Sequence, residues 1–184
     1  MKIIGIISRS QYIANKEFIG CYINYAKKVK RNEISPIIIP EDSDINILSI
    51  CDGIISPGGD NISSFDRKVL DYVIKHDIPY LGICLGMQVM GESLIKTSKH
   101  YLNNHIVYLN KNSLLHKIYK CDSILVNSRH KDKINKTKYT VSAISHDNII
   151  EGLEVKGKKF ILGVQWHPED LNDNKLFDYF ISKL

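Results

Sequence analysis

The sequence predicts an α/β protein with a mostly parallel central sheet and an added antiparallel β portion. Short apolar strands alternate with amphipathic helices through the first half, and strand patterns separated by turns fill much of the second half. Strand-helix-strand units connect parallel neighbours, whereas strands joined by tight turns pair antiparallel. With 184 residues, 43% hydrophobic and 24% charged, the chain is expected to form one soluble domain over residues 1–184.

The elements of the first half follow from apolar runs, helical spacing and flanking caps. Strands are predicted over 1–8, 35–40, 52–55 and 78–83. Helices are predicted over 16–31 with Asn15 as the cap, over 45–50 with Asp44, and over 64–75 with Ser63 or Ser64. A further helix is expected from Gly86 to about Ser93.

The second half is expected to contain mainly strands and loops. Strands are predicted over 105–109, 123–126, 139–145, 149–154 and 160–166, with a turn at 146–148. The rest of 97–119 is expected to be loop with short β segments, and the polar stretch 131–138 an exposed loop. A closing helix is expected from its cap, Asn172, to Lys183.

Composition excludes several function classes. The formal net charge is +5, but the lysines are dispersed, which predicts a solvated surface and no nucleic-acid partner. No apolar run approaches the roughly 20 residues of a membrane span, and no signal-peptide pattern is visible, so a cytoplasmic protein without a membrane partner is expected. The four cysteines show no CxxC spacing and the His and Asp residues no ligand spacing, so no metal or cofactor is predicted.

The stretch 78–88 predicts a nucleophile elbow, in which a strand turns sharply into a helix at Cys84. Gly82 and Gly86 flank the cysteine where such a turn brings backbone segments close together. The N-terminus of the following helix would favour the thiolate form. The alternative is that Cys84 is a small buried hydrophobic residue.

Two further motifs supply what a cysteine nucleophile needs. Gly58 and Gly59 follow a predicted strand, so their N–H groups suit an oxyanion hole, although an ordinary glycine turn explains them equally well. His167 stands at a strand end, and Glu169 follows two residues later. A histidine oriented by a carboxylate is the usual base for such a nucleophile. A lone histidine in this place is more often a satisfied polar residue, but the three motifs together favour catalysis.

The motifs Gly82–Gln88 and Gly163–Glu169 closely resemble the signatures of class I glutamine amidotransferases, and the order of motifs covers nearly the whole chain. The resemblance implies a flavodoxin-like three-layer sandwich and a Cys84, His167, Glu169 triad. It also implies an oxyanion hole formed by the backbone N–H groups of Leu85 and Gly59, and a glutamyl pocket lined by Gly58 and Gln88.

Within that superfamily the chain resembles the γ-glutamyl hydrolase branch, peptidase C26, which includes γ-glutamyl-γ-aminobutyrate hydrolase-like enzymes. The features that carry this resemblance are Pro57–Asp60, Val126–His130 and the run 141–151. Two departures concern the substrate: Leu85 follows the cysteine where the branch usually has arginine, and Lys131-Asp132 replaces His-Gln. Asn127, Ser128, Arg129 and His130 are expected to be further substrate-binding residues, and Ser128, Arg129, His130 and Lys131 are expected to face the leaving group.

The resulting expectation is a cysteine-dependent hydrolase that cleaves a γ-glutamyl amide of a small molecule and releases glutamate and an amine or amidate. The basic residues near Arg129 would suit a phosphate- or nucleotide-linked leaving group, such as a γ-glutamyl phosphoramidate of a cell-surface sugar pathway. The main alternative is a glutaminase subunit that delivers ammonia to a separate synthetase partner. A non-catalytic module and a protein-cleaving cysteine peptidase also stay open, as does a homodimer.

Overall fold

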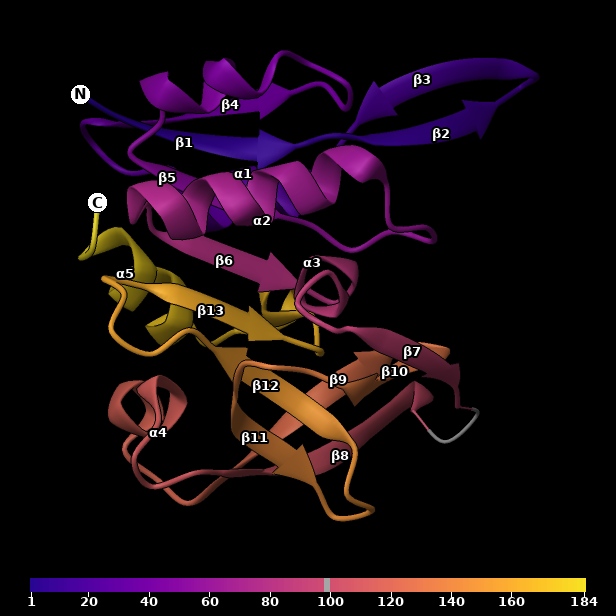
Figure 1. Cartoon of the computed structure of the whole chain (residues 1–184), viewed down its shortest axis with the longest axis vertical. Helices are drawn as coiled ribbons and strands as arrows, with labels where there is room; N and C mark the ends of the chain where they lie inside the picture. Colours follow the sequence, from indigo (N-terminus) through magenta and orange to yellow (C-terminus); the bar gives the residue numbers. More distant parts are fainter. Residues whose placement is uncertain (98–99) are drawn as a thin grey trace.

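A nine-stranded sheet forms the centre of the protein, in the order β4-β1-β5-β6-β13-β12-β11-β8-β9 (Figure 1). The computed structural model describes residues 1–97 and 100–184, apart from the side chain of Ile13. The parallel half comprises β1 (Lys2–Ile7), β4 (Ile34–Ile39), β5 (Gly53–Ser56), β6 (Tyr80–Ile83) and β13 (Ile161–Val164). The antiparallel half comprises β12 (Ile150–Glu154), β11 (Thr140–Ser145), β8 (Tyr101–Leu109) and β9 (Ser123–Arg129). The predicted sheet type is therefore confirmed.

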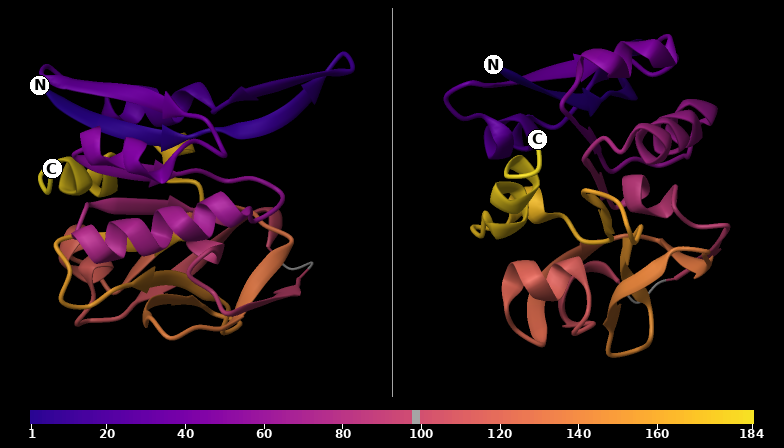
Figure 2. Two further views of the ribbon diagram at one scale, coloured as in Figure 1. Left: turned by 45° about the horizontal axis from the view of Figure 1, so that its top comes forward. Right: turned by 60° about the vertical axis from the view of Figure 1, so that its left-hand side comes forward.

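Helices cover both faces of this sheet (Figure 2). One face carries α1 (Ile23–Val29), α4 (Leu114–Tyr119) and α5 (Lys175–Ile181), and the other carries η1 (Ile45–Ile50), α2 (Ser64–His76) and α3 (Leu85–Gln88). Each face buries its own apolar cluster, the first around Trp166 and Phe177 and the second around Phe65 and Met87. These two cores give the three layers.

Side-chain caps begin η1 and α2, as predicted. Asp44 accepts a hydrogen bond from the Asn46 N–H at 2.8 Å at the start of η1. Ser63 and Asp66 form a reciprocal capping box at the start of α2, which satisfies two N–H groups that the helix itself leaves unpaired. Asp66 thereby becomes buried at the end of the helix nearest the sheet's carboxyl edge.

The predicted helix over 16–31 is wrong in its first half. A hairpin of β2 (Arg9–Ile13) and β3 (Lys16–Gly20) occupies this region and projects from the sheet (Figure 1). Ala14 and Asn15 both have positive φ, 49° and 62°, which is the backbone of a two-residue hairpin turn. Asn15 therefore stands in a turn and does not cap a helix; the helical spacing belongs only to α1.

Three smaller expectations are also corrected. The helix after Cys84 ends at Gln88, because the chain leaves it for β7 (Ser93–Lys96). The predicted loop 131–138 contains β10 (Asp132–Lys136), which pairs with β7 and buries Ile134. The stretch 97–119, expected as loop and strand, also contains α4, a six-residue helix too short for its periodicity to stand out.

Among the residues that the structure describes, no helix combines the length and the apolar character needed to cross a membrane.

Candidate active site

Two adjacent parallel strands bring Cys84 and His167 to the same edge of the sheet. Cys84 follows β6, His167 follows β13, and the strands pair with Ile83 opposite Val164. The Cys84 N–H also donates to the Val164 carbonyl at 2.8 Å. Since parallel strands end at a common edge, residues 83 positions apart become neighbours.

The turn at Cys84 has the geometry of a nucleophile elbow. Cys84 has φ 53° and ψ −102°, an unusual conformation for a residue with a side chain, and α3 begins at the next residue. A Cβ on Gly86 would lie 2.0 Å from the Ser56 carbonyl oxygen, and one on Gly82 would lie 2.5 Å from the Gly86 carbonyl oxygen. Backbone atoms occupy both places, so glycine is required at both positions.

His167 lies between a carboxylate and the thiol. Its Nδ1 is 2.7 Å from Glu169 Oε1, and a further hydrogen bond joins its side chain to Cys84. Burial alone would lower the pKa of His167, but the hydrogen bonds to Cys84 and Glu169 outweigh burial and raise it to about 10. The arrangement favours a protonated imidazole beside the sulfur.

The main chain of His167 is fixed by Asn127. The Asn127 amide donates to the His167 carbonyl at 2.9 Å and accepts from the His167 N–H at 2.8 Å. These bonds join β9 to the residue that carries the imidazole. Asn127, expected among the substrate-binding residues, thus has its amide group directed at His167, and we regard it as a positioning residue.

Two glutamines pack behind the sulfur. Gln165 Nε2 lies 3.6 Å from Cys84 Sγ, and Gln165 Oε1 accepts from Gln88 Nε2 at 3.3 Å. Gln88 also donates to the Asp132 carbonyl at 3.1 Å. Gln165 was not singled out from the sequence, although its position in the β13-to-His167 connection was a usable signal.

The Gly58-Gly59 turn lies against the cysteine and the histidine. A Cβ on Gly58 would lie 3.1 Å from the His167 ring and 3.5 Å from the Cys84 Cβ, and a Cβ on Gly59 would lie 2.9 Å from the Leu85 side chain. Leu85 is the first residue of α3, so its N–H has no acceptor within the helix. Gly59 therefore packs against the side chain of the residue that follows the cysteine.

Arg9 holds this turn in place. Its guanidinium donates to the Pro57 carbonyl at 3.0 Å and the Gly58 carbonyl at 3.3 Å, and it pairs with Glu41 at 2.6 Å and Asp66 at 2.8 Å. Sequence reasoning missed Arg9. The available signal was its position directly after the first buried strand, at the edge where the site forms.

Tyr25, a buried residue of α1, also belongs to the site. Its hydroxyl accepts from the Gly58 N–H at 3.3 Å. Burial and the negative charge of Glu169 raise the pKa of Tyr25, so the hydroxyl keeps its proton. The glycine turn and the carboxylate are thus linked through one side chain of α1.

Two hollows open beside the cysteine and the histidine. The first, about 470 Å³, is lined by His167, Glu169, Gly58 and the Arg9 end of the hairpin. The second, about 460 Å³, is lined by Cys84, Gln88 and a group of polar residues, namely Asp60, Lys96, Arg129, His130, Lys131 and Asp132. Gly59, Asp60 and Arg129 border both hollows.

The residues expected on the leaving-group side are not gathered in one place. Arg129 borders both hollows and forms an ion pair with Asp170. His130 and Gln88 line the same second hollow, so they do not separate a glutamyl side from a leaving-group side. Ser128 is buried and its hydroxyl donates to the His100 carbonyl at 2.5 Å, which directs it away from the two hollows.

The comparisons agree with this architecture. The family model described as Peptidase C26 matches residues 63–169. A glutamine amidotransferase-like protein of Rickettsia prowazekii is 30% identical over 220 residues, covering 76% of this chain and 78% of that protein. The CTP synthase of Lactobacillus johnsonii is 25% identical over 194 residues, covering 80% of this chain and 36% of that protein.

A solved structure described as a GMP synthase subunit from Thermoplasma acidophilum matches with a TM-score of 0.76 at 22% identity. The match covers 100% of this chain and 94% of that chain. At this identity the likeness concerns the fold, and it confirms the flavodoxin-like three-layer sandwich that the sequence resemblance implied.

Proposed function

This chain belongs to the peptidase C26 family of class I glutamine amidotransferase-like proteins, and we propose that it hydrolyses a γ-glutamyl amide of a small molecule through Cys84. Membership of this family indicates a cysteine hydrolase-type enzyme. The observation that carries the proposal is the elbow: a strained Cys84 at the start of α3, hydrogen-bonded to a histidine that Glu169 orients.

The proposed reaction has two halves: Cys84 first forms a thioester with the glutamyl group, and water then hydrolyses this thioester. Cys84 Sγ attacks the γ-carbonyl carbon, and the N–H groups of Leu85 and Gly59 stabilise the developing oxyanion. His167 protonates the departing nitrogen as the C–N bond breaks, which leaves a thioester. The now neutral His167 takes a proton from water, the hydroxide attacks the thioester, and glutamate leaves as the thiol is restored.

The charges of the two hollows favour one orientation of the substrate. In the second hollow Lys96 forms an ion pair with Asp132, and Arg129 pairs with Asp170. Lys131 and Asp60 add one charge of each sign, which suits the carboxylate and amino groups of a glutamyl moiety. The first hollow would then receive the leaving group.

In the first hollow, both arginines are ion-paired: Arg9 with Glu41 and Asp66, and Arg129 with Asp170. Glu169 and Asp60 add negative charge to its lining. A neutral or cationic amine therefore fits this hollow better than the phosphate-bearing leaving group that the basic residues suggested in the sequence.

The test is glutamate release from a panel of γ-glutamyl conjugates by the purified chain. The panel contains glutamine, γ-glutamyl amines and γ-glutamyl phosphoramidates. Turnover of γ-glutamyl amines is expected, with loss of activity by at least about 10⁴-fold in Cys84→Ala. Cys121→Ala, which removes an exposed thiol, serves as the matched control and should retain activity. Turnover that survives in Cys84→Ala would exclude this mechanism.

The second candidate is a glutaminase that delivers ammonia to a synthetase, and similarity to a CTP synthase supports it. Under that function the isolated chain would be nearly inactive on every member of the panel, and glutamine would be hydrolysed only when a partner synthetase is added. Robust turnover of a γ-glutamyl amine by the chain on its own would decide for the first candidate.

A further inference from the structure

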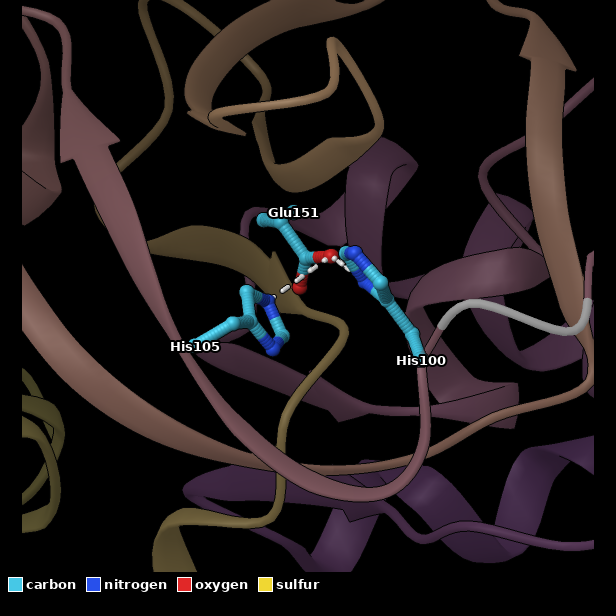
Figure 3. A group of neighbouring side chains, drawn as sticks. All are labelled: His100, His105 and Glu151. Atoms are coloured by element: carbon cyan, nitrogen blue, oxygen red, sulfur yellow. Dashed lines mark hydrogen bonds and ion pairs between the residues drawn. The ribbon is translucent and has the colours of Figure 1, made fainter.

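Beside the second hollow, four buried side chains converge from distant segments. His100 precedes β8, His105 lies within β8, His130 connects β9 to β10, and Glu151 lies in β12. Figure 3 shows the Glu151 carboxylate between the rings of His100 and His105. The exposed fractions are 1%, 7%, 2% and 0% in chain order. We call these residues the His₃Glu cluster.

The outward nitrogens of two rings are already committed. His100 Nε2 is 3.1 Å from Asp147 Oδ1, and His130 Nδ1 is 2.9 Å from the Asp132 carbonyl oxygen. A carboxylate and a carbonyl only accept, so each of these ring nitrogens carries a hydrogen. In the neutral rings the inward nitrogens, His100 Nδ1 and His130 Nε2, then hold lone pairs. Metal-binding histidines are oriented in this way by their outer hydrogen bonds.

The inward atoms crowd one another. His100 Nδ1 and His130 Nε2 are 3.2 Å apart, and they lie 2.9 Å and 3.6 Å from Glu151 Oε1. Three lone-pair-bearing atoms at these distances repel one another unless positive charge lies among them. The cluster therefore needs a cation, either an added proton or a metal ion.

Unpaired polar atoms favour the metal ion. His105 Nε2 faces Glu151 Oε1 at 3.3 Å, but His105 Nδ1 makes no hydrogen bond with the described residues, and the same holds for Glu151 Oε2. Burying such atoms without partners is costly. One proton joins only one pair of atoms, whereas a metal ion accepts lone pairs from His100, His105 and Glu151 together.

The spacing fits a small tetrahedral ion. One donor atom each from His100, His105 and Glu151 lie within 4.8 Å of one another. The separations from Glu151 Oε1, 2.9 Å to His100 Nδ1 and 3.3 Å to His105 Nε2, lie near the edge of about 3.3 Å that ligand bonds of ~2.0 Å produce around a tetrahedral zinc ion. Imidazole and carboxylate are donors that Zn²⁺ accepts readily.

We propose that the His₃Glu cluster binds one Zn²⁺ ion, with His100, His105 and Glu151 as its protein ligands. All three ligands are buried, so the ion would lie inside the protein. It would join β12 to β8 and to the residue that precedes β8. It would also brace the second hollow, because the Gln165 N–H donates to the Glu151 carbonyl and Gln88 donates to the Asp132 carbonyl. Sequence reasoning predicted no metal because the ligands are scattered from residue 100 to residue 151.

The test measures bound zinc in Cys84→Ala, which removes the catalytic thiol as a competing ligand. The chain is stripped with a chelator, titrated with Zn²⁺, passed through gel filtration and assayed for metal. One zinc per chain is expected, with a rise in Tm of about 5–10 °C at a hundredfold excess over Kd. Adding Asp147→Ala, which removes the hydrogen-bond acceptor of His100 Nε2, should weaken zinc binding about 10–100-fold.

A matched pair of histidine variants locates the ion. In the Cys84→Ala background, His105→Ala should lose the zinc, whereas His76→Ala, at an exposed histidine on α2, should keep it. If His105→Ala does not fold, the Co²⁺ form of Cys84→Ala decides. A tetrahedral d–d spectrum without sulfur charge transfer supports the proposal. Absence of stoichiometric metal, retention of zinc in a folded His105→Ala, or a cysteine-ligand spectrum would overturn it, and the cluster would then hold a proton.

Discussion

At the residue scale, the pairing of His167 with Cys84 and Glu169 links stability to pH. The folded pKa is raised to about 10 from an ordinary value of 6.5. Folding therefore favours the protonated imidazole, so this stabilisation is complete below about pH 6.5 and is lost as pH rises through 10. The free energy of unfolding of the wild type should fall more steeply across this window than that of His167→Gln, as measured by urea denaturation at fixed ionic strength.

His76→Gln is the control for this comparison, because His76 is an exposed histidine at the last position of α2. The unfolding free energy of His76→Gln should fall with pH as steeply as that of the wild type. The difference in this slope between the wild type and His167→Gln reports the imidazole alone, because other groups that titrate above pH 8 are present in both proteins. Identical slopes for wild type and His167→Gln would show that His167 does not gain a proton on folding.

The site residues that belong to local motifs could be identified from the sequence. Cys84 stands between two glycines, and His167 and Glu169 are two residues apart, so each could be identified without knowing the fold. Arg9 and Tyr25 could not be assigned, because their partners, Asp66, Pro57 and Gly58, lie more than 30 residues away.

At the element scale, the contact between α3 and β5 requires that residue 86 have no side chain. A Cβ at residue 86 would overlap the Ser56 carbonyl, which is backbone and has no rotamer to change. Gly86→Ala is therefore expected to destabilise the fold by about 3 kcal/mol or more, as measured by chemical denaturation. The elbow would shift with the helix, so activity should fall as well.

Gly20→Ala provides the comparison. A Cβ at Gly20, at the end of β3, would meet nothing within 4 Å. Its free energy of unfolding should stay within about 0.5 kcal/mol of the wild type. If Gly86→Ala and Gly20→Ala lose similar amounts of stability, the destabilisation reflects a general effect of replacing glycine and not the α3–β5 contact.

The elements themselves were predicted where length or caps gave a clear signal. Helix α2 has thirteen residues and a capping box, and its boundaries agree with the prediction within one residue. The β2–β3 hairpin was missed because its turn is Ala14-Asn15, which lacks the glycine that usually marks positive φ. Phe18 and Tyr22 are exposed, but their separation of four residues is the spacing expected on one face of a helix.

At the scale of the whole molecule, Arg9 joins three separate parts. It connects the end of β1 to Glu41 after β4, to Asp66 at the start of α2, and to the turn after β5. Removing one member of a buried charge network leaves the others unpaired. Arg9→Gln is expected to lower the free energy of unfolding by about 3 kcal/mol and to reduce kcat, because the Gly58 turn loses two of its hydrogen bonds.

An exposed arginine next to the same network is the matched control. Arg67→Gln removes the same charge from the surface of α2 and should change stability by less than about 0.5 kcal/mol. Adding Asp66→Asn to Arg9→Gln should recover part of the loss, since the buried carboxylate is then neutral. No recovery would indicate that Arg9 acts mainly through the turn.

The pairing of β6 with β13 also bears on how such proteins diversify. The sulfur and the imidazole are carried on neighbouring strands, so the ladder between Ile83 and Val164 sets their separation, and distant loops do not. Insertions or deletions in the hairpin, in the helical connections or at the β9 margin can accumulate over generations without moving the reacting atoms apart. Homologues of unequal length can therefore retain one chemistry while acquiring new specificities at the rim.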